Sequence, residues 1–136
     1  MKIGTIGSGF IVRYMLENVA KTEGISCEAV YSRTTENGQK LASEFGVKKI
    51  YTDLDEMCSD DEIDTIYIAS PNSLHYEHAK KALTYGKHVI CEKPFTPTYK
   101  EAEELVNLAN HHSYCVLVTS PNISLFNNIQ PLNIEV

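Results

Sequence analysis

The chain begins with a short apolar stretch that leads directly into two glycines one residue apart. This segment covers residues 2–12, and the glycines are Gly7 and Gly9. Behind them, apolar residues recur at the spacing of one buried helix face: Val12, Met15, Leu16 and Val19. The pattern predicts a strand, a tight turn with little side-chain bulk, and a helix whose first N–H groups are free. Such a turn suits an anion, because the free N–H groups and the positive end of the helix dipole both point at it.

The glycine turn is the first candidate binding site. Glycine pairs also occur in ordinary turns, but a pair between a strand and a helix favours the pyrophosphate of a dinucleotide. The residues that we expect to approach it are Gly7, Ser8, Gly9, Phe10 and Ile11. The third small position of this fingerprint is Val12, whose branched side chain we expect to keep helix and strand slightly further apart.

Strand and helix patterns alternate along the rest of the chain with short connections. We predict strands at 2–6, 26–31, 49–51, 65–69, 88–91 and 114–118, with helices at 10–21, 35–45, 53–58, 74–85 and from 98 onward. Six strands joined by five crossovers predict an α/β fold with a doubly wound parallel sheet, in the strand order 3-2-1-4-5-6. Residues 120–136 have no helical period, and we expect an irregular tail there.

Several residues are of the types that cap the N-terminus of a helix. Thr52 or Asp53 is placed to cap the short third helix, and Ser73 to cap the fourth. Thr98 and Glu101 fit a capping box, in which each side chain bonds the backbone of the other.

Polar residues follow the second, fourth and fifth predicted strands at their carboxyl ends. They are Ser32 and Arg33, then Ser70, Pro71 and Asn72, then Glu92, Lys93 and Pro94. Parallel strands bring these breaks to the same edge of the sheet as the glycine turn. No carboxylate ends the second strand, where enzymes specific for NAD carry one, so Ser32 and Arg33 favour a 2′-phosphate and hence NADP.

Composition excludes several other classes of function. The net charge is −6 and no basic cluster occurs, which argues against a nucleic-acid partner. The N-terminus lacks the layout of a signal peptide and no apolar run could span a membrane, so we expect a cytoplasmic protein. The four cysteines are widely spaced, and we expect reduced thiols that are mostly buried.

Four matches in order show a family resemblance: Gly7-Ser8-Gly9, Tyr31-Ser32-Arg33, the segment from Ser70 to His75, and Glu92-Lys93-Pro94. The chain resembles the N-terminal half of the glucose-fructose oxidoreductase, inositol dehydrogenase and rhizopine catabolism (Gfo/Idh/MocA) family of NAD(P)-dependent oxidoreductases. The resemblance covers about residues 1–119, and implies a Rossmann domain there. The family's second domain, with an Asp and a His of the catalytic set, has no counterpart in residues 120–136, so we expect a truncated enzyme.

The resemblance also implies roles for the residues at the strand ends. It places Lys93 toward the nicotinamide C4 and the substrate oxygen as the acid–base group, and we expect it to be partly buried and followed by a cis peptide. It places Pro71 and Asn72 beside the nicotinamide ribose. The wider cofactor-binding set includes Ser70, His75 and Glu92, of which Glu92 orients the turn rather than taking part in the chemistry.

Two functions remain open. The first is an NAD(P)-dependent oxidoreductase that transfers hydride to or from a sugar or polyol, uses NADP or NAD, and forms a homo-oligomer. The second is a short nucleotide-binding module without activity of its own. A metal site is not expected, because His75 and His78 are one helical turn apart with no carboxylate or thiol placed to join them.

Overall fold

The computed structural model describes residues 1–119 of the 136-residue chain. Within them it contains six strands: β1 (Lys2–Ile6), β2 (Ser26–Tyr31), β3 (Lys49–Tyr51), β4 (Thr65–Ile68), β5 (His88–Cys91) and β6 (Val116–Val118). The helices are α1 (Phe10–Val19), α2 (Thr35–Phe45), α3 (Leu54–Ser59), α4 (His75–Thr84) and α5 (Tyr99–His112), with a 3₁₀ turn η1 (Asn72–Leu74) before α4. The predicted tail, residues 120–136, lies outside the described residues.

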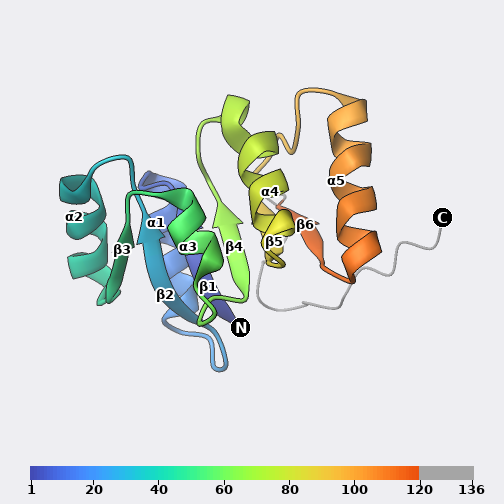
Figure 1. Cartoon of the computed structure of the whole chain (residues 1–136). Coiled ribbons are helices and arrows are strands. Elements are labelled where there is room, and N and C mark those ends of the chain that lie inside the picture. Colours follow the sequence, from blue (N-terminus) through green and yellow to red (C-terminus); the bar gives the residue numbers. More distant parts are fainter. Residues whose placement is uncertain (120–136) are drawn as a thin grey trace.

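The strands form one parallel sheet in the order β3-β2-β1-β4-β5-β6, as predicted (Figure 1). The reversal of strand order therefore falls between β1 and β4, the point where open α/β sheets bind ligands. Backbone bonds continue the ladder past the strand ends: Ala69 N–H donates to Ile6 O at 2.9 Å, and Glu92 N–H to Ile68 O at 2.9 Å. The loops that follow β1, β4 and β5 thus begin side by side.

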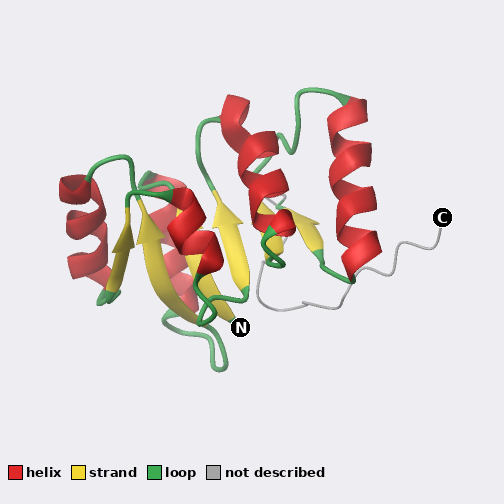
Figure 2. Ribbon diagram, viewed as in Figure 1, coloured by secondary structure: helices red, strands yellow, loops and turns green. Residues whose placement is uncertain are grey.

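Helices cover both faces of the sheet, which is why β4 is apolar at nearly every position (Figure 2). On one face α3, α4 and α5 bury a cluster with Ile6, Ile66 and Ile68, and in Figure 1 these helices lie in front of the sheet. On the other face α1 and α2 bury Ile3, Val30 and Tyr67. Neighbouring positions of one strand belong to opposite clusters, as the two-residue period of a strand requires.

The predicted helix ends are partly confirmed. Asp53 caps α3 by accepting from two backbone N–H groups, and Thr98 with Glu101 forms the complete capping box of α5. The prediction for Ser73 was wrong, because residues 72–74 form a 3₁₀ turn in front of α4 and the cap position falls on Leu74. Several element boundaries also differ from the predicted ones by one or two residues. Among them, α1 ends at Val19, β4 ends at Ile68 and β6 begins at Val116.

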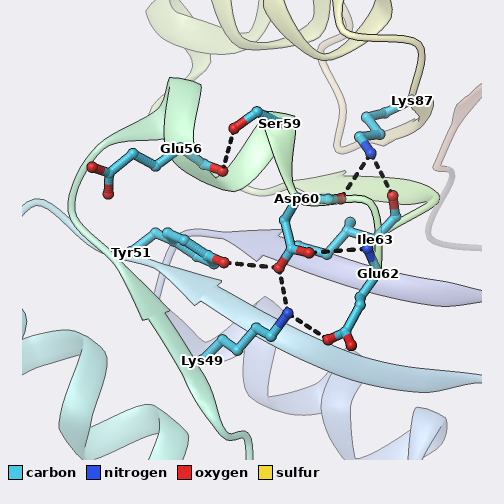
Figure 3. Close-up of polar contacts among 8 residues, drawn as sticks. All are labelled: Lys49, Tyr51, Glu56, Ser59, Asp60, Glu62, Ile63 and Lys87. Carbon is cyan, nitrogen blue, oxygen red and sulfur yellow. Dashed lines mark hydrogen bonds and ion pairs between the residues drawn. The ribbon is translucent and has the colours of Figure 1, made fainter.

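A polar cluster closes the turn between α3 and β4 (Figure 3). The Lys49 ammonium lies 2.6 Å from Asp60 Oδ2 and 2.5 Å from Glu62 Oε2, and the Tyr51 hydroxyl donates to Asp60 Oδ2 at 2.8 Å. Lys87, only 7% exposed, donates from Nζ to the carbonyls of Asp60 and Ile63 at 2.9 and 2.7 Å. Since residues 60–64 precede β4 and Lys87 precedes β5, the cluster lies away from the carboxyl ends of these strands.

Two further features concern the described residues as a set. No helix within residues 1–119 is long and apolar enough to cross a membrane. All four cysteines are free: Cys58 and Cys91 are buried, Cys27 is partly buried, and Cys115 is exposed, so the expectation of mostly buried thiols holds for two of the four.

Candidate cofactor-binding site

The two glycines of the first turn are glycines for different reasons. Gly7 has a φ of 116°, and a Cβ on it would lie 2.5 Å from the carbonyl oxygen of Ala69. The fold itself therefore requires glycine at this position. Gly9 has an ordinary φ of −76°, and a Cβ on it would meet nothing within 4 Å. The bare backbone of Gly9 faces open space, which suits the close approach of a phosphate group.

The start of α1 also suits an anion. Its N-cap is Gly9, no side chain caps its first turn, and no acidic residue occurs there. By contrast, side chains cap α2, α3 and α5. The free N–H groups and the helix dipole are thus left for a ligand. Phe10 is 82% exposed and Ile11 and Ser8 are exposed beside this opening, whereas Val12 is buried beneath it with Cγ2 3.4 Å from where a Cβ of Gly7 would be.

Ser32 and Arg33 end β2, the strand next to β1. Ser32 is only 8% exposed, and its N–H donates to Tyr51 O at 3.0 Å, which fixes the backbone at this point. Arg33 is exposed. The helix that follows, α2, packs closely against Ser32 and Ile50 at Gly38. A Cβ on Gly38 would lie 2.7 Å from Ile50 Cγ2 and 3.3 Å from Ser32 Cβ, so only glycine fits there.

The loop after β4 is fixed by two histidines of α4. His75 is 1% exposed, and its Nε2 lies 2.8 Å from the carbonyl oxygen of Ser70. His78 Nδ1 shares a hydrogen bond with Ser70 Oγ at 2.9 Å, and burial lowers the pKa of His78, which favours its neutral form. Pro71 and Asn72 are exposed at the tip of this loop.

The loop after β5 carries Glu92 and Lys93. Both carboxylate oxygens of Glu92 are occupied: Tyr67 donates its hydroxyl to Oε1 and Thr119 donates its hydroxyl to Oε2, each at 2.6 Å. Burial, together with this bond to Glu92, raises the pKa of Tyr67, so its hydroxyl keeps its proton. Glu92 is therefore tied to β4 and to the end of β6, in keeping with an orienting role.

Lys93 itself is exposed, so the expectation of a partly buried lysine was wrong. It lies in a turn beyond β5 that no described element covers, and an ammonium group stays hydrated there. The Lys93–Pro94 peptide is cis, as expected.

Topology brings most of the predicted residues to one edge of the sheet. Gly7 to Ile11 follow β1, Ser32 and Arg33 follow β2, Ser70 to Asn72 follow β4, and Glu92 and Lys93 follow β5. His75 is the exception, because it is buried, with each ring nitrogen 2.8 Å from a backbone carbonyl oxygen.

Sequence reasoning missed the partners that hold these loops. Tyr67 counted as one more apolar residue of a buried strand, and Thr119 and His78 received no role at the site. A signal was available for Tyr67, because a hydroxyl in the middle of a covered strand needs a partner.

The chain is similar to known proteins over most of its described residues. A family model described as an oxidoreductase family with an NAD-binding Rossmann fold matches residues 1–120. Among curated proteins, scyllo-inositol 2-dehydrogenase (NADP(+)) of Bacillus subtilis is 40% identical over 109 residues, which are 80% of this chain and 33% of that protein. The 1,5-anhydro-D-fructose reductase of Ensifer adhaerens is 33% identical over 118 residues, covering 80% of this chain and 35% of the reductase.

Solved structures show the same architecture. Biliverdin reductase from Synechocystis, in complex with biliverdin and NADP+, superposes with a TM-score of 0.80 at 29% identity, over 86% of this chain and 37% of that one. The chain thus spans about a third of the length of the relatives that it matches.

Proposed function

The chain belongs to the oxidoreductase family with an NAD-binding Rossmann fold, and from this premise we propose that residues 1–119 hold NADP(H) or NAD(H) along the carboxyl edge of the sheet. The pyrophosphate lies over Gly9 and the start of α1, and the nicotinamide lies between the β4 and β5 loops. The observation that carries the proposal is the open, uncapped glycine turn, since nothing within residues 1–119 requires glycine at position 9.

Lys93 is the residue that we assign to the chemistry. The bound nicotinamide supplies or accepts a hydride at C4. The Lys93 ammonium donates a hydrogen bond to the substrate oxygen, stabilises the negative charge that develops on it during reduction, and gives up a proton to it. In the oxidative direction the same amine takes the proton from the alcohol. Glu92 is already bonded through both oxygens and holds the turn in place.

We propose NADP(H) as the preferred cofactor. β2 ends in Ser32 and Arg33 rather than in a carboxylate, and an arginine pairs with a 2′-phosphate where a carboxylate would repel it. The name of the Bacillus subtilis relative, which specifies NADP(+), supports this assignment.

The substrate class proposed for the complete protein is a sugar or polyol with a secondary alcohol, or the matching carbonyl compound. The names of two relatives, an inositol dehydrogenase and an anhydrofructose reductase, support it. The alternative is that the 136-residue chain binds the cofactor without turnover, and this is favoured by the chain spanning about a third of these relatives.

Binding and turnover are tested separately. NADPH and NADH are titrated into the 136-residue chain by fluorescence, and the chain is then assayed with a panel of inositols and sugars. We expect micromolar or tighter binding of NADPH. If turnover is present, we expect Lys93→Met to lower kcat at least about a hundredfold, as loss of general acid–base catalysis does. Binding without turnover supports the binding module, and no binding of either cofactor refutes the proposal.

A further inference from the structure

One buried histidine links the two loops that we assign to the nicotinamide. His75 opens α4, directly after the 3₁₀ turn, and is 1% exposed. Its Nε2 lies 2.8 Å from Ser70 O in the β4 loop, and its Nδ1 lies 2.8 Å from Pro94 O in the β5 loop. A single imidazole therefore spans the carboxyl ends of two neighbouring strands.

This geometry removes His75 from the surface that a ligand could touch. Both ring nitrogens face carbonyl oxygens, which only accept hydrogen bonds, so each nitrogen bonds its carbonyl only when it carries a proton. A neutral imidazole has one N–H and satisfies one carbonyl at a time, and the doubly protonated ring satisfies both. Either way, no nitrogen remains for a cofactor or a metal ion.

The bond to Pro94 bears on Lys93, the residue before it. Lys93 is exposed, and within the described residues its side chain makes no hydrogen bond or ion pair that would orient it. Its direction is set by the backbone on either side. On the near side, Glu92 is fixed by hydroxyls of Tyr67 and Thr119. On the far side, the Pro94 carbonyl oxygen lies 2.8 Å from His75 Nδ1, which donates to it in the form protonated at Nδ1.

The Ser70 end of the link has a second support. Ser70 Oγ bonds His78, one turn further along α4, in addition to the bond from its carbonyl to His75. The β4 loop therefore keeps one of its two histidine contacts when His75 is lost. At Pro94 itself, the contact with His75 is the only side-chain hydrogen bond among the described residues, so nothing replaces it there.

We propose that His75 is a positioning residue for Lys93, which it aims at the nicotinamide by holding the Pro94 carbonyl from Nδ1. The inference rests on the proposed cofactor site and extends it, since it assigns the orientation of the reactive lysine to a residue that touches neither cofactor nor substrate.

Two substitutions separate the two ends of the imidazole. In His75→Asn the side-chain amide nitrogen takes the place of Nδ1 and keeps the bond to Pro94. In His75→Gln the amide nitrogen reaches the place of Nε2 and keeps the bond to Ser70 instead. Both variants are polar, and Gln is close to histidine in volume whereas Asn is smaller. A role in filling space alone therefore predicts the larger effect for His75→Asn, the opposite of the order expected from positioning. His111→Gln, at an exposed position on α5, is the control for loss of an imidazole.

The readout is the affinity of the 136-residue chain for two ligands, measured by titration alongside a urea unfolding curve. One is NADPH, and the other is 2′-phospho-ADP-ribose, which keeps the adenine and pyrophosphate but lacks the nicotinamide. We expect His75→Gln to weaken NADPH binding about tenfold and His75→Asn less than about threefold, with affinity for 2′-phospho-ADP-ribose unchanged in both. A tenfold change corresponds to about 1.4 kcal/mol, the scale of one buried hydrogen bond.

Each other result has a definite meaning. Equal losses in His75→Asn and His75→Gln, or parallel losses for both ligands, overturn the positioning role. A wild-type chain that binds neither ligand refutes the cofactor site itself, which is a different failure. If one of the two variants does not fold, the other still tests the proposal. His75→Gln must then weaken NADPH binding about tenfold, or His75→Asn less than about threefold, and any other value overturns the positioning role.

Discussion

At the scale of single residues, the two glycines of the first turn separate the demands of folding from those of binding. Gly7 is required by its φ of 116° and by the Ala69 carbonyl against it. Gly9 has neither constraint among the described residues, so its lack of a side chain leaves room for the proposed ligand. Two alanine substitutions, two positions apart, should therefore behave in opposite ways.

We expect Gly7→Ala to lower the free energy of unfolding by at least about 1–3 kcal/mol, because the backbone conformation is strained for alanine and the methyl group has no room. For Gly9→Ala we expect a change of less than about 1 kcal/mol. The reduced entropy of the unfolded chain offsets the poorer capping by alanine there. Affinity for NADPH should nonetheless fall at least about tenfold. Urea unfolding and fluorescence titration measure the two quantities, and unimpaired NADPH binding by Gly9→Ala would remove the phosphate from this turn.

Cofactor preference is also decided by single residues. Ser32→Asp places a carboxylate at the end of β2, where it repels a 2′-phosphate and bonds the ribose hydroxyls of NAD. We expect the ratio of NADPH to NADH affinity to fall at least about a hundredfold. Arg33→Ala should weaken the binding of NADPH about tenfold, the scale of one lost charge-assisted hydrogen bond, and leave the affinity for NADH unchanged. Ser32→Ala is the control for loss of the Ser32 hydroxyl without a new carboxylate. Tighter binding of NADH than of NADPH by the wild-type chain would contradict the preference for NADPH.

At the scale of elements, the short β3 and α3 depend on the polar cluster around Asp60. β3 has only three residues, and its Lys49 and Tyr51 both reach Asp60 beyond α3. Hydrogen bonds from Lys49 and from the Glu62 backbone lower the pKa of Asp60 from 3.8 to about 2. The folded state thus holds the ionised carboxylate more strongly than the unfolded state does.

The lowered pKa of Asp60 predicts the direction of a pH effect. Its stabilising contribution is complete above the unfolded value of 3.8 and is lost as the pH falls through about 2, because the unfolded chain takes up the proton first. Asp60→Asn should be less stable at pH 7 and should lose less stability between pH 4 and pH 2 than the wild type. Unfolding curves across this interval measure the difference, and parallel losses in the two proteins would exclude the contribution of Asp60.

Local signals in the sequence predicted the elements well and the long-range bonds poorly. The Asp53 cap and the Thr98–Glu101 box follow from patterns within a few residues. The strand order follows from the alternation of strands and helices along the chain and the rules that govern their crossovers. The Ser73 cap failed because the chain enters α4 through a 3₁₀ turn after Pro71. The bond from Tyr67 to Glu92 joins residues 25 positions apart, and only the register of β4 against β5 brings them together.

At the scale of the whole molecule, the described residues form two apolar layers that share one sheet. The β4 strand contributes Ile66 and Ile68 to one layer and Tyr67 to the other. Both layers therefore pack on the same strand, β4. The cofactor site proposed above is formed by the loops after β1, β2, β4 and β5, which only the complete fold brings together. Binding and folding should be coupled.

We expect NADPH to stabilise the chain against urea. At a free concentration one hundred times its Kd, a ligand that binds only the folded state raises the free energy of unfolding by about 2.7 kcal/mol. The unfolding midpoint should rise with NADPH concentration in the wild type and much less in Gly9→Ala at the same concentration. A midpoint independent of NADPH would show that the cofactor does not bind the folded chain.

The carboxylate of Glu92 lies between two hydroxyls, and this constrains which substitutions evolution can accept at the three positions. Tyr67, Glu92 and Thr119 lie on three different segments, yet each bond at Glu92 needs a donor from one of the other two. Loss of the hydroxyl at position 67 or 119 removes the present hydrogen-bond donor of one Glu92 oxygen, so a glutamate at position 92 is then less favourable. Substitutions at the three positions should therefore be correlated among descendants, and drift at any one of them should be slower than at the exposed surface around it.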